Sequence, residues 1–222
     1  MSTPAMKRYA AEIYRLQQDI PYVSLSDLSE SAAASLQATS RMVGRMKEKG
    51  YLDHEPRRGM RLTAEGERLA MPALRRHRLV EVFLVRVMKF GWDEAHDLSD
   101  KFELGINDLL EDRLDEISGH PTRCPHGEPI PSKEGIMPVV NDVSLAQLQP
   151  VKRCLISRVR THDPEKLRYF AELGLLPQVE FELQFRAPFN GPFRIHTREE
   201  EHVLGYDMAA ALFVEPLDAA PA

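Results

Sequence analysis

The sequence has few cysteines, no long apolar runs and no net positive charge. Each of these features bears on which classes of protein are possible. Two cysteines in 222 residues cannot build a disulfide framework, so nothing indicates an oxidising compartment. The longest apolar runs, such as 82–85, are far shorter than the ~20 residues that span a bilayer. The N-terminus lacks the apolar core of a signal peptide. We therefore expect a cytoplasmic protein with no membrane partner.

The formal charge of −5 argues, as an average, against nucleic-acid binding. The distribution of charge argues otherwise. The first 76 residues carry 13 Lys/Arg and 9 Asp/Glu, whereas the remainder carries 16 and 25. A chain of this length, 43% hydrophobic, is expected to form two or three modules. The asymmetry indicates that the first of them meets a polyanion.

The basic part predicts three helices followed by a hairpin. Helices are expected at 4–18, 26–33 and 37–49, and strands at 51–54 and 60–62. This order is typical of a winged helix-turn-helix, although an all-α module with a merely structural hairpin gives a similar pattern.

Exposed positions around the third of these helices, and the hairpin tip, carry hydrogen-bonding or cationic side chains suited to DNA. The predicted contact residues are Ser35, Gln37, Ala38, Ser40, Arg41, Arg45, Arg57 and Arg58.

Residues 72–117 are predicted to be helical. The segment 78–88 is apolar on nearly every side, which favours a homodimer, although a plain core helix would have the same pattern. Glycines and prolines mark 119–150 as a linker with turns. Short strand-like pieces in 151–217, with one helix at 164–173, favour a small barrel.

Two sets of potential metal ligands lie on the predicted central helices. His77 and Glu81 are four residues apart and share one helix face, and so do His96, Asp100 and Glu103 on the next helix. Imidazoles with carboxylates suit a borderline-to-hard divalent ion. Either set alone could also be an ordinary ion pair on a helix surface. Two such sets on consecutive helices favour a metal-binding site.

At this point the chain resembles the metal-dependent repressors of the diphtheria toxin repressor type, including the manganese transport regulators. The resemblance is carried, in the family's order, by the segments SRMVGRMKEKGYL, LTAEGERLA, RHRLVE, HDLSDKFE and CPHGEPIP, and by the C-terminal stretch from LAQLQPVKRCLISRV to LGYDMAAALFV. It implies a mainly α protein with small β: a winged helix-turn-helix (1–72), a helical dimerisation and metal-binding domain (73–140) and an SH3-like β-barrel of FeoA type (141–222).

The resemblance also implies ligands. His77, Glu81 and His96 match one family metal site, whose barrel ligands fall at Asp163 and at Glu165 or His162. Neither cysteine falls at a ligand position.

The second family site departs from the pattern. It retains Asp100 and Glu103, but it has Arg8 and Leu104 where other members have ligands. Our hypothesis is that Arg8 replaces the metal by pairing with Asp100 or Glu103; the alternative is a phosphate contact.

These observations predict a homodimeric regulator that binds double-stranded, palindromic operator DNA when loaded with Mn²⁺, or alternatively Fe²⁺, and controls metal-homeostasis genes. A winged-helix regulator that senses a small molecule or peptide through its barrel, without metal, is the alternative. No nucleophile motif or Gly-rich phosphate loop indicates an enzyme.

Overall fold

The computed structural model describes residues 2–55, 57–102, 105–148, 153–161, 163–198 and 200–217. The chain divides into two compact units, each built from several chain segments. The N-terminal unit consists of 1–77, 103–108 and 130–138, and the C-terminal unit of 78–102, 109–129 and 139–222. None of the helices in the described ranges is long and apolar enough to cross a membrane.

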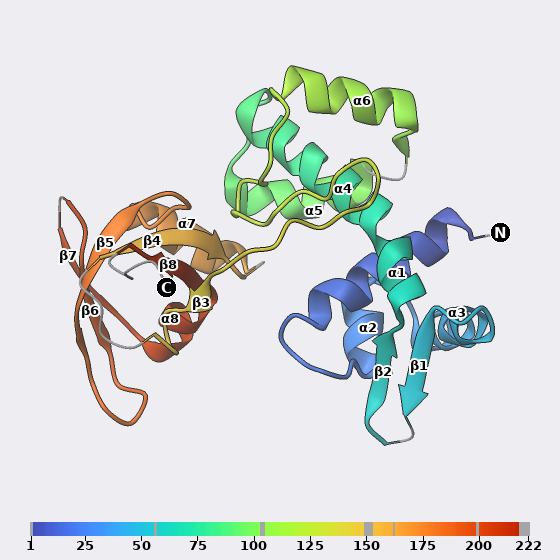
Figure 1. Cartoon of the computed structure of the whole chain (residues 1–222), viewed down its shortest axis with the longest axis horizontal. Helices are drawn as coiled ribbons and strands as arrows, with labels where there is room; N and C mark the ends of the chain where they lie inside the picture. The colour runs from blue at the N-terminus through green and yellow to red at the C-terminus, as the bar shows by residue number, and fades with distance from the viewer. Residues whose placement is uncertain are drawn as a thin grey trace. The chain divides into compact units, whose positions relative to one another are not determined.

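Three helices and a hairpin open the N-terminal unit: α1 (Pro4–Leu16), α2 (Leu25–Ser31), α3 (Leu36–Glu48), β1 (Leu52–Glu55) and β2 (Gly59–Leu62). The hydroxyls of Thr3, Ser24 and Ser35 each cap the helix that follows, by accepting a hydrogen bond from an amide of its first turn. The strands pair antiparallel from Leu52 opposite Leu62 to the hairpin tip (Figure 1).

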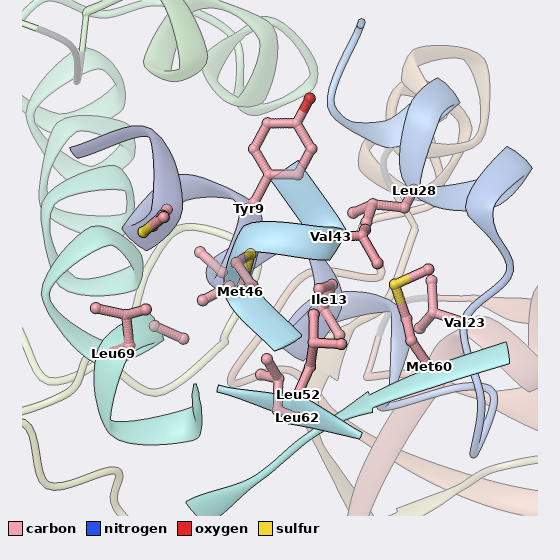
Figure 2. Close-up of a cluster of buried hydrophobic side chains, with 14 of the residues drawn as sticks. Tyr9, Ile13, Val23, Leu28, Val43, Met46, Leu52, Met60, Leu62 and Leu69 are labelled. Carbon is pink, nitrogen blue, oxygen red and sulfur yellow. The ribbon is translucent and has the colours of Figure 1, made fainter. Parts of the chain in front are cut away.

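A single apolar core holds these elements together. Figure 2 shows Tyr9 and Ile13 of α1 converging with Val43 and Met46 of α3, and with side chains of both strands. The spacings of three and four residues put each pair on one helix face. The layout is that of a winged helix-turn-helix, as predicted.

Helix α4 (Ala64–Arg86) continues through Pro72, where the sequence suggests separate helices. Ala70, Met71 and Leu74 are buried on both sides of the proline. Their packing into the N-terminal core holds the helix together despite the lost amide donor. Helix α4 therefore passes from one unit to the other, and the division falls directly after His77. Helices α5 (Trp92–Phe102) and α6 (Asp108–Ile117) follow.

The remaining elements build an antiparallel sheet in the order β3-β8-β4-β5-β6-β7. The strands are β3 (Val143–Ser144), β4 (Cys154–Val159), β5 (Glu180–Arg186), β6 (Phe193–His196), β7 (Glu201–Leu204) and β8 (Leu212–Pro216), with helices α7 (Pro164–Glu172) and α8 (Tyr206–Ala211) beside them (Figure 1).

The predicted SH3-like β-barrel is found as an antiparallel sheet that does not close. Within the described residues β3 and β7 end the sheet and do not pair with each other. Register shifts in β4 and β5 bend the sheet around the buried core without closing it.

Candidate metal centre and DNA-binding face

Helices α4 and α5 bring most of the predicted central ligands together. His77 and Glu81 lie one turn apart on α4, with exposed fractions of 1% and 2%. His96 of α5 reaches the same place, with its Nδ1 atom 3.1 Å from Glu81 Oε1. A buried carboxylate needs such a partner.

Two groups of potential ligands result. His77, His96 and Asp100 each offer one ligand atom, and these atoms lie within 4.8 Å of one another. Glu81, Cys124 and His126 form a second group by the same measure, and all three are buried. The hydrogen bond between His96 and Glu81 joins the two groups. The first group is a nitrogen and carboxylate set, whereas the second includes a thiol.

A tight turn presents Cys124 and His126. The amide of Cys124 donates to the carbonyl of Glu128 at 2.9 Å, and the amide of Gly127 donates back to the carbonyl of Cys124 at 2.9 Å. Gly127 has a φ of +88°, which favours glycine. A Cβ there would lie 2.8 Å from the Cα of Arg158, so the turn rests directly on β4.

The tautomer of His126 follows from its surroundings. Its Nε2 atom lies 2.8 Å from the backbone carbonyl of Trp92, which can only accept, so Nε2 carries the proton. Its Nδ1 atom then faces Glu81 Oε1 at 3.5 Å and Cys124 Sγ at 3.9 Å. The Trp92 ring stacks on the imidazole at a centroid distance of 5.4 Å. Metal-binding histidines are commonly oriented by a carbonyl in this way.

Burial and charge shift the acidities within this group. Burial raises the pKa of the Cys124 thiol, and the nearby Glu81 carboxylate adds to this effect. Burial is the largest single effect and would lower the pKa of His126, but the charge of Glu81 and the interactions with Cys124 together raise the pKa well above 6.5. The pocket therefore favours positive charge beside Glu81.

The other predicted ligands lie elsewhere. Asp163 is exposed and caps α7, accepting from the amides of Glu165 at 2.9 Å and Lys166 at 3.4 Å. Glu165 is also exposed, and neither carboxylate joins the two ligand groups found among the described residues. Glu103, like His162 and Leu104, lies outside the described residues. Arg8 is half-buried on α1, and its proposed pairing stays a prediction.

Sequence reasoning missed Cys124 and His126. We expected neither cysteine at a ligand position, but the Sγ of Cys124 lies within 4.8 Å of potential ligand atoms of Glu81 and His126. The signal was present in CPHGEPIP, which has a cysteine and a histidine two residues apart beside a glycine. The partner Glu81 is far away in the sequence, so only the fold brings them together.

The predicted DNA contacts lie mostly on exposed surface. Gln37, Ser40, Arg41 and Arg45 of α3 are exposed, whereas Ala38 is half-buried. Ser35 is exposed, but its hydroxyl is used as the cap of α3, 3.3 Å from the Ala38 amide.

The wing tip has its own interactions. Arg57 is exposed, with a φ of +68°. Arg58 is also exposed; it pairs with Glu55 at 2.9 Å, and its guanidinium lies 4.4 Å from the centre of the Tyr22 ring. The hydroxyl of Tyr22 in turn donates to Glu55 at 2.6 Å.

A winged helix followed by buried imidazoles, carboxylates and a thiol defines a class: DNA-binding regulators controlled by metal ions. The family descriptions that match the sequence say the same. They are an iron-dependent repressor N-terminal DNA-binding domain (1–60), an iron-dependent repressor metal-binding and dimerisation domain (63–132) and a FeoA domain (143–216). The chain belongs to the family of metal-dependent transcriptional repressors that includes the iron-dependent and manganese-dependent regulators.

Individual relatives are similar to this chain over most of its length or over about half of it. A solved manganese-dependent transcriptional repressor in complex with manganese is 31% identical, with a TM-score of 0.87 and coverage of 96% of this chain and 100% of that one. The iron-dependent repressor IdeR of Mycobacterium bovis is 27% identical over 93% of this chain and 95% of its own length. The regulator MntR of Lysinibacillus sphaericus is 34% identical over 45% of this chain and 70% of its own length.

Proposed function

We propose that this chain is a homodimeric repressor that binds a palindromic operator when loaded with Mn²⁺, or alternatively Fe²⁺, and controls metal-homeostasis genes. It would act in the cytoplasm, where its DNA lies, and without catalysing a reaction. The observation that carries the proposal is the presence, beside a winged helix, of two groups of potential ligands, one on α4 and α5 and one on α4 and the turn of Cys124 and His126.

The donor atoms fit divalent ions. His77, His96 and Asp100 would hold one ion, and Glu81, Cys124 and His126 a second. Glu103, Asp163 and Glu165 stay predicted ligands from the family resemblance. A bound ion would supply positive charge that neutralises the buried carboxylates and cross-links the segments that carry them.

The chemistry of the two groups separates their preferences. Two imidazoles and a carboxylate suit Mn²⁺ and Fe²⁺, whereas a thiolate favours softer ions such as Zn²⁺ or Fe²⁺. A ligand set without sulfur favours Mn²⁺, and the thiol of Cys124 removes that argument for the second group only. The manganese-bound relative supports Mn²⁺, and the iron-dependent relatives keep Fe²⁺ as the alternative.

The protein's own residues would carry the switch. Glu81 fixes His96 of α5 against α4, and His126 fixes the turn against Trp92. When these segments are held, a larger fraction of molecules would be competent for the operator, and apparent affinity scales with that fraction. Gln37, Ser40 and Arg41 would read bases, while Arg45, Arg57 and Arg58 would hold phosphates.

A dimer is supported by exposed apolar residues. Leu79, Val80, Val82 and Leu84 are buried within one copy, and the segment 78–88 exposes Val87 and Met88 at its end, at 40% and 47%, rather than a continuous face. Helix α6 does supply one, because Leu109, Leu110 and Ile117 are 70%, 48% and 61% exposed. We keep 1–72, 73–140 and 141–222 as the proposed functional division.

The test is fluorescence anisotropy of a labelled fragment of the protein's own promoter region. Metal-free protein is titrated first, then protein with Mn²⁺ or, without oxygen, Fe²⁺. We expect metal to tighten binding, His77→Ala to abolish the effect, and Cys124→Ser to change which ion acts. Equal binding with a chelator present would refute the proposal and favour a metal-independent regulator, which the metal-dependent relatives do not support.

A further inference from the structure

Glu128, whose side chain is 20% exposed, lies at the centre of a largely buried charge cluster in the C-terminal unit. Arg78 Nη2 is 3.4 Å from its carboxylate, Arg158 Nη1 is 3.2 Å away, and Arg160 Nε is 4.0 Å away. The side chains of all three arginines are at most 12% exposed. One carboxylate facing three guanidiniums in a poorly hydrated place makes strong, directional contacts.

These contacts join three parts of the unit. Arg78 belongs to α4, three residues before Glu81, and it also donates to the carbonyl of Pro129. Arg158 belongs to β4, and it forms two further hydrogen bonds to Asp142 at 2.7 and 2.8 Å. Glu128 itself closes the turn that presents Cys124 and His126, because its carbonyl accepts the Cys124 amide.

A second bond attaches the same turn to β4. The amide of Val159 donates to the carbonyl of His126 at 2.8 Å. Arg123 Nη1 bridges the carbonyl of Gly127 at 2.8 Å and the Ser157 hydroxyl at 3.2 Å. The turn is therefore clamped between the helix that carries Glu81 and a strand of the FeoA domain.

We propose that Glu128 is a positioning residue for the metal group Glu81, Cys124 and His126, and that the FeoA domain thereby sets the geometry of this site without donating a ligand. The inference rests on the proposed function, because it assumes that this group binds metal. Loss of the Glu128 charge removes the carboxylate that Arg78, Arg158 and Arg160 share, although Arg158 keeps Asp142 and Arg78 keeps the carbonyl of Pro129. The turn then loses its fixed distance from Glu81, although no ligand has changed.

The experiment is a Co²⁺ titration of the full-length protein, followed by the thiolate-to-cobalt charge-transfer absorption. This signal reports only an ion bound to cysteine, and so it does not register the group without sulfur. We expect Glu128→Ala to weaken Co²⁺ binding by about 10- to 100-fold, the usual effect of removing an orienting partner. Added acetate, a small carboxylate that fits among the three arginines, is expected to restore part of the affinity.

The matched control is Glu180→Ala, which removes another arginine-paired carboxylate from the same compact unit, 2.6 Å from Arg153 on the surface. It is expected to change the affinity by less than about two-fold. If Glu128→Ala does not fold, the isosteric Glu128→Gln is judged by the same criterion.

Two results would overturn the inference. Wild-type affinity in Glu128→Ala would do so while leaving the proposed function intact. A wild-type protein without the charge-transfer band would also overturn the inference, because Cys124 would then bind no metal, while a metal switch at His77, His96 and Asp100 would remain.

Discussion

Gly127 offers a direct test of how the ligand-bearing turn meets the FeoA sheet. We consider the substitution Gly127→Ala. The residue has a φ of +88°, and an added Cβ would lie 2.8 Å from the Cα of Arg158 and 3.0 Å from the carbonyl carbon of Ser157, with the Ser157 oxygen closer still. These neighbours are backbone atoms of β4, so they cannot swing aside as a flexible side chain would.

The expected cost has two parts. The left-handed conformation alone costs an alanine about 1 kcal/mol. Relief of the contact needs a displacement of roughly 1 Å, since carbon atoms pack at about 3.5–4 Å. A shift of that size stretches the Val159–His126 hydrogen bond, now 2.8 Å, beyond its useful range. Losing one or two buried bonds adds about 1–3 kcal/mol.

The assay is thermal unfolding of the metal-free protein, followed by fluorescence. The chain has a single tryptophan, Trp92, and its ring stacks on His126, so the signal comes from the site. The control is Gly174→Ala: Gly174 has a φ of +65°, but nothing lies within 4 Å of its added Cβ. At about 2–4 °C per kcal/mol, we expect the control to lower Tm by a few degrees and Gly127→Ala to lower it about two to four times as much. Equal shifts would show that the turn does not rest on β4.

Three further perturbations test other parts of the molecule. Ser35→Ala should lower the free energy of unfolding, measured in urea, by about 1 kcal/mol, because the Ser35 hydroxyl caps α3. Weaker operator binding at unchanged stability would instead show that the hydroxyl contacts DNA. Glu55→Gln should tighten binding to non-operator DNA by about two- to five-fold at low salt and steepen the salt dependence of that binding. The reason is that Arg58 loses its ion pair with Glu55. An unchanged salt dependence would show that Arg58 does not contact phosphate. Against the opposing effect of burial, Glu81 and Cys124 together raise the pKa of His126. This shift stabilises the metal-free protein below about pH 6.5, and the stabilisation is lost as the pH rises through the folded-state pKa. Tm of metal-free protein should therefore fall as the pH rises above neutral, and a His126→Gln variant that shows the same fall would contradict this assignment.

Local patterns predicted much of the fold. The winged helix was predicted from signals that each lie within a few neighbouring residues. They are the helix caps, the spacing of Tyr9 and Ile13, and the basic hairpin tip. The helix expected at 164–173 is found as α7 for the same reason. Strand β7 and helix α8 were not predicted, because their short segments have weak periodicity of their own and are fixed by pairing with β6 and packing on the sheet core.

The candidate site was predicted only in part. His77, Glu81, His96 and Asp100 follow from helical spacing on two consecutive helices. The grouping of Glu81 with Cys124 and His126 does not, because it depends on where an irregular turn meets α4. Asp163 likewise sits in the expected loop, yet its carboxylate caps α7, a role that depends on the exact start of that helix.

The N-terminal unit has a consequence for how such proteins can be cut and recombined. It includes 130–138, far along the chain from the winged helix, where the buried Arg75 donates to the carbonyl of Pro131 at 2.9 Å and Met137 packs against the apolar core. A fragment that ends near residue 77 leaves Arg75 without that acceptor and uncovers the core beside Met71. An exchange of DNA-binding domains between relatives would therefore succeed only if residues 130–138 are transferred together with the winged helix.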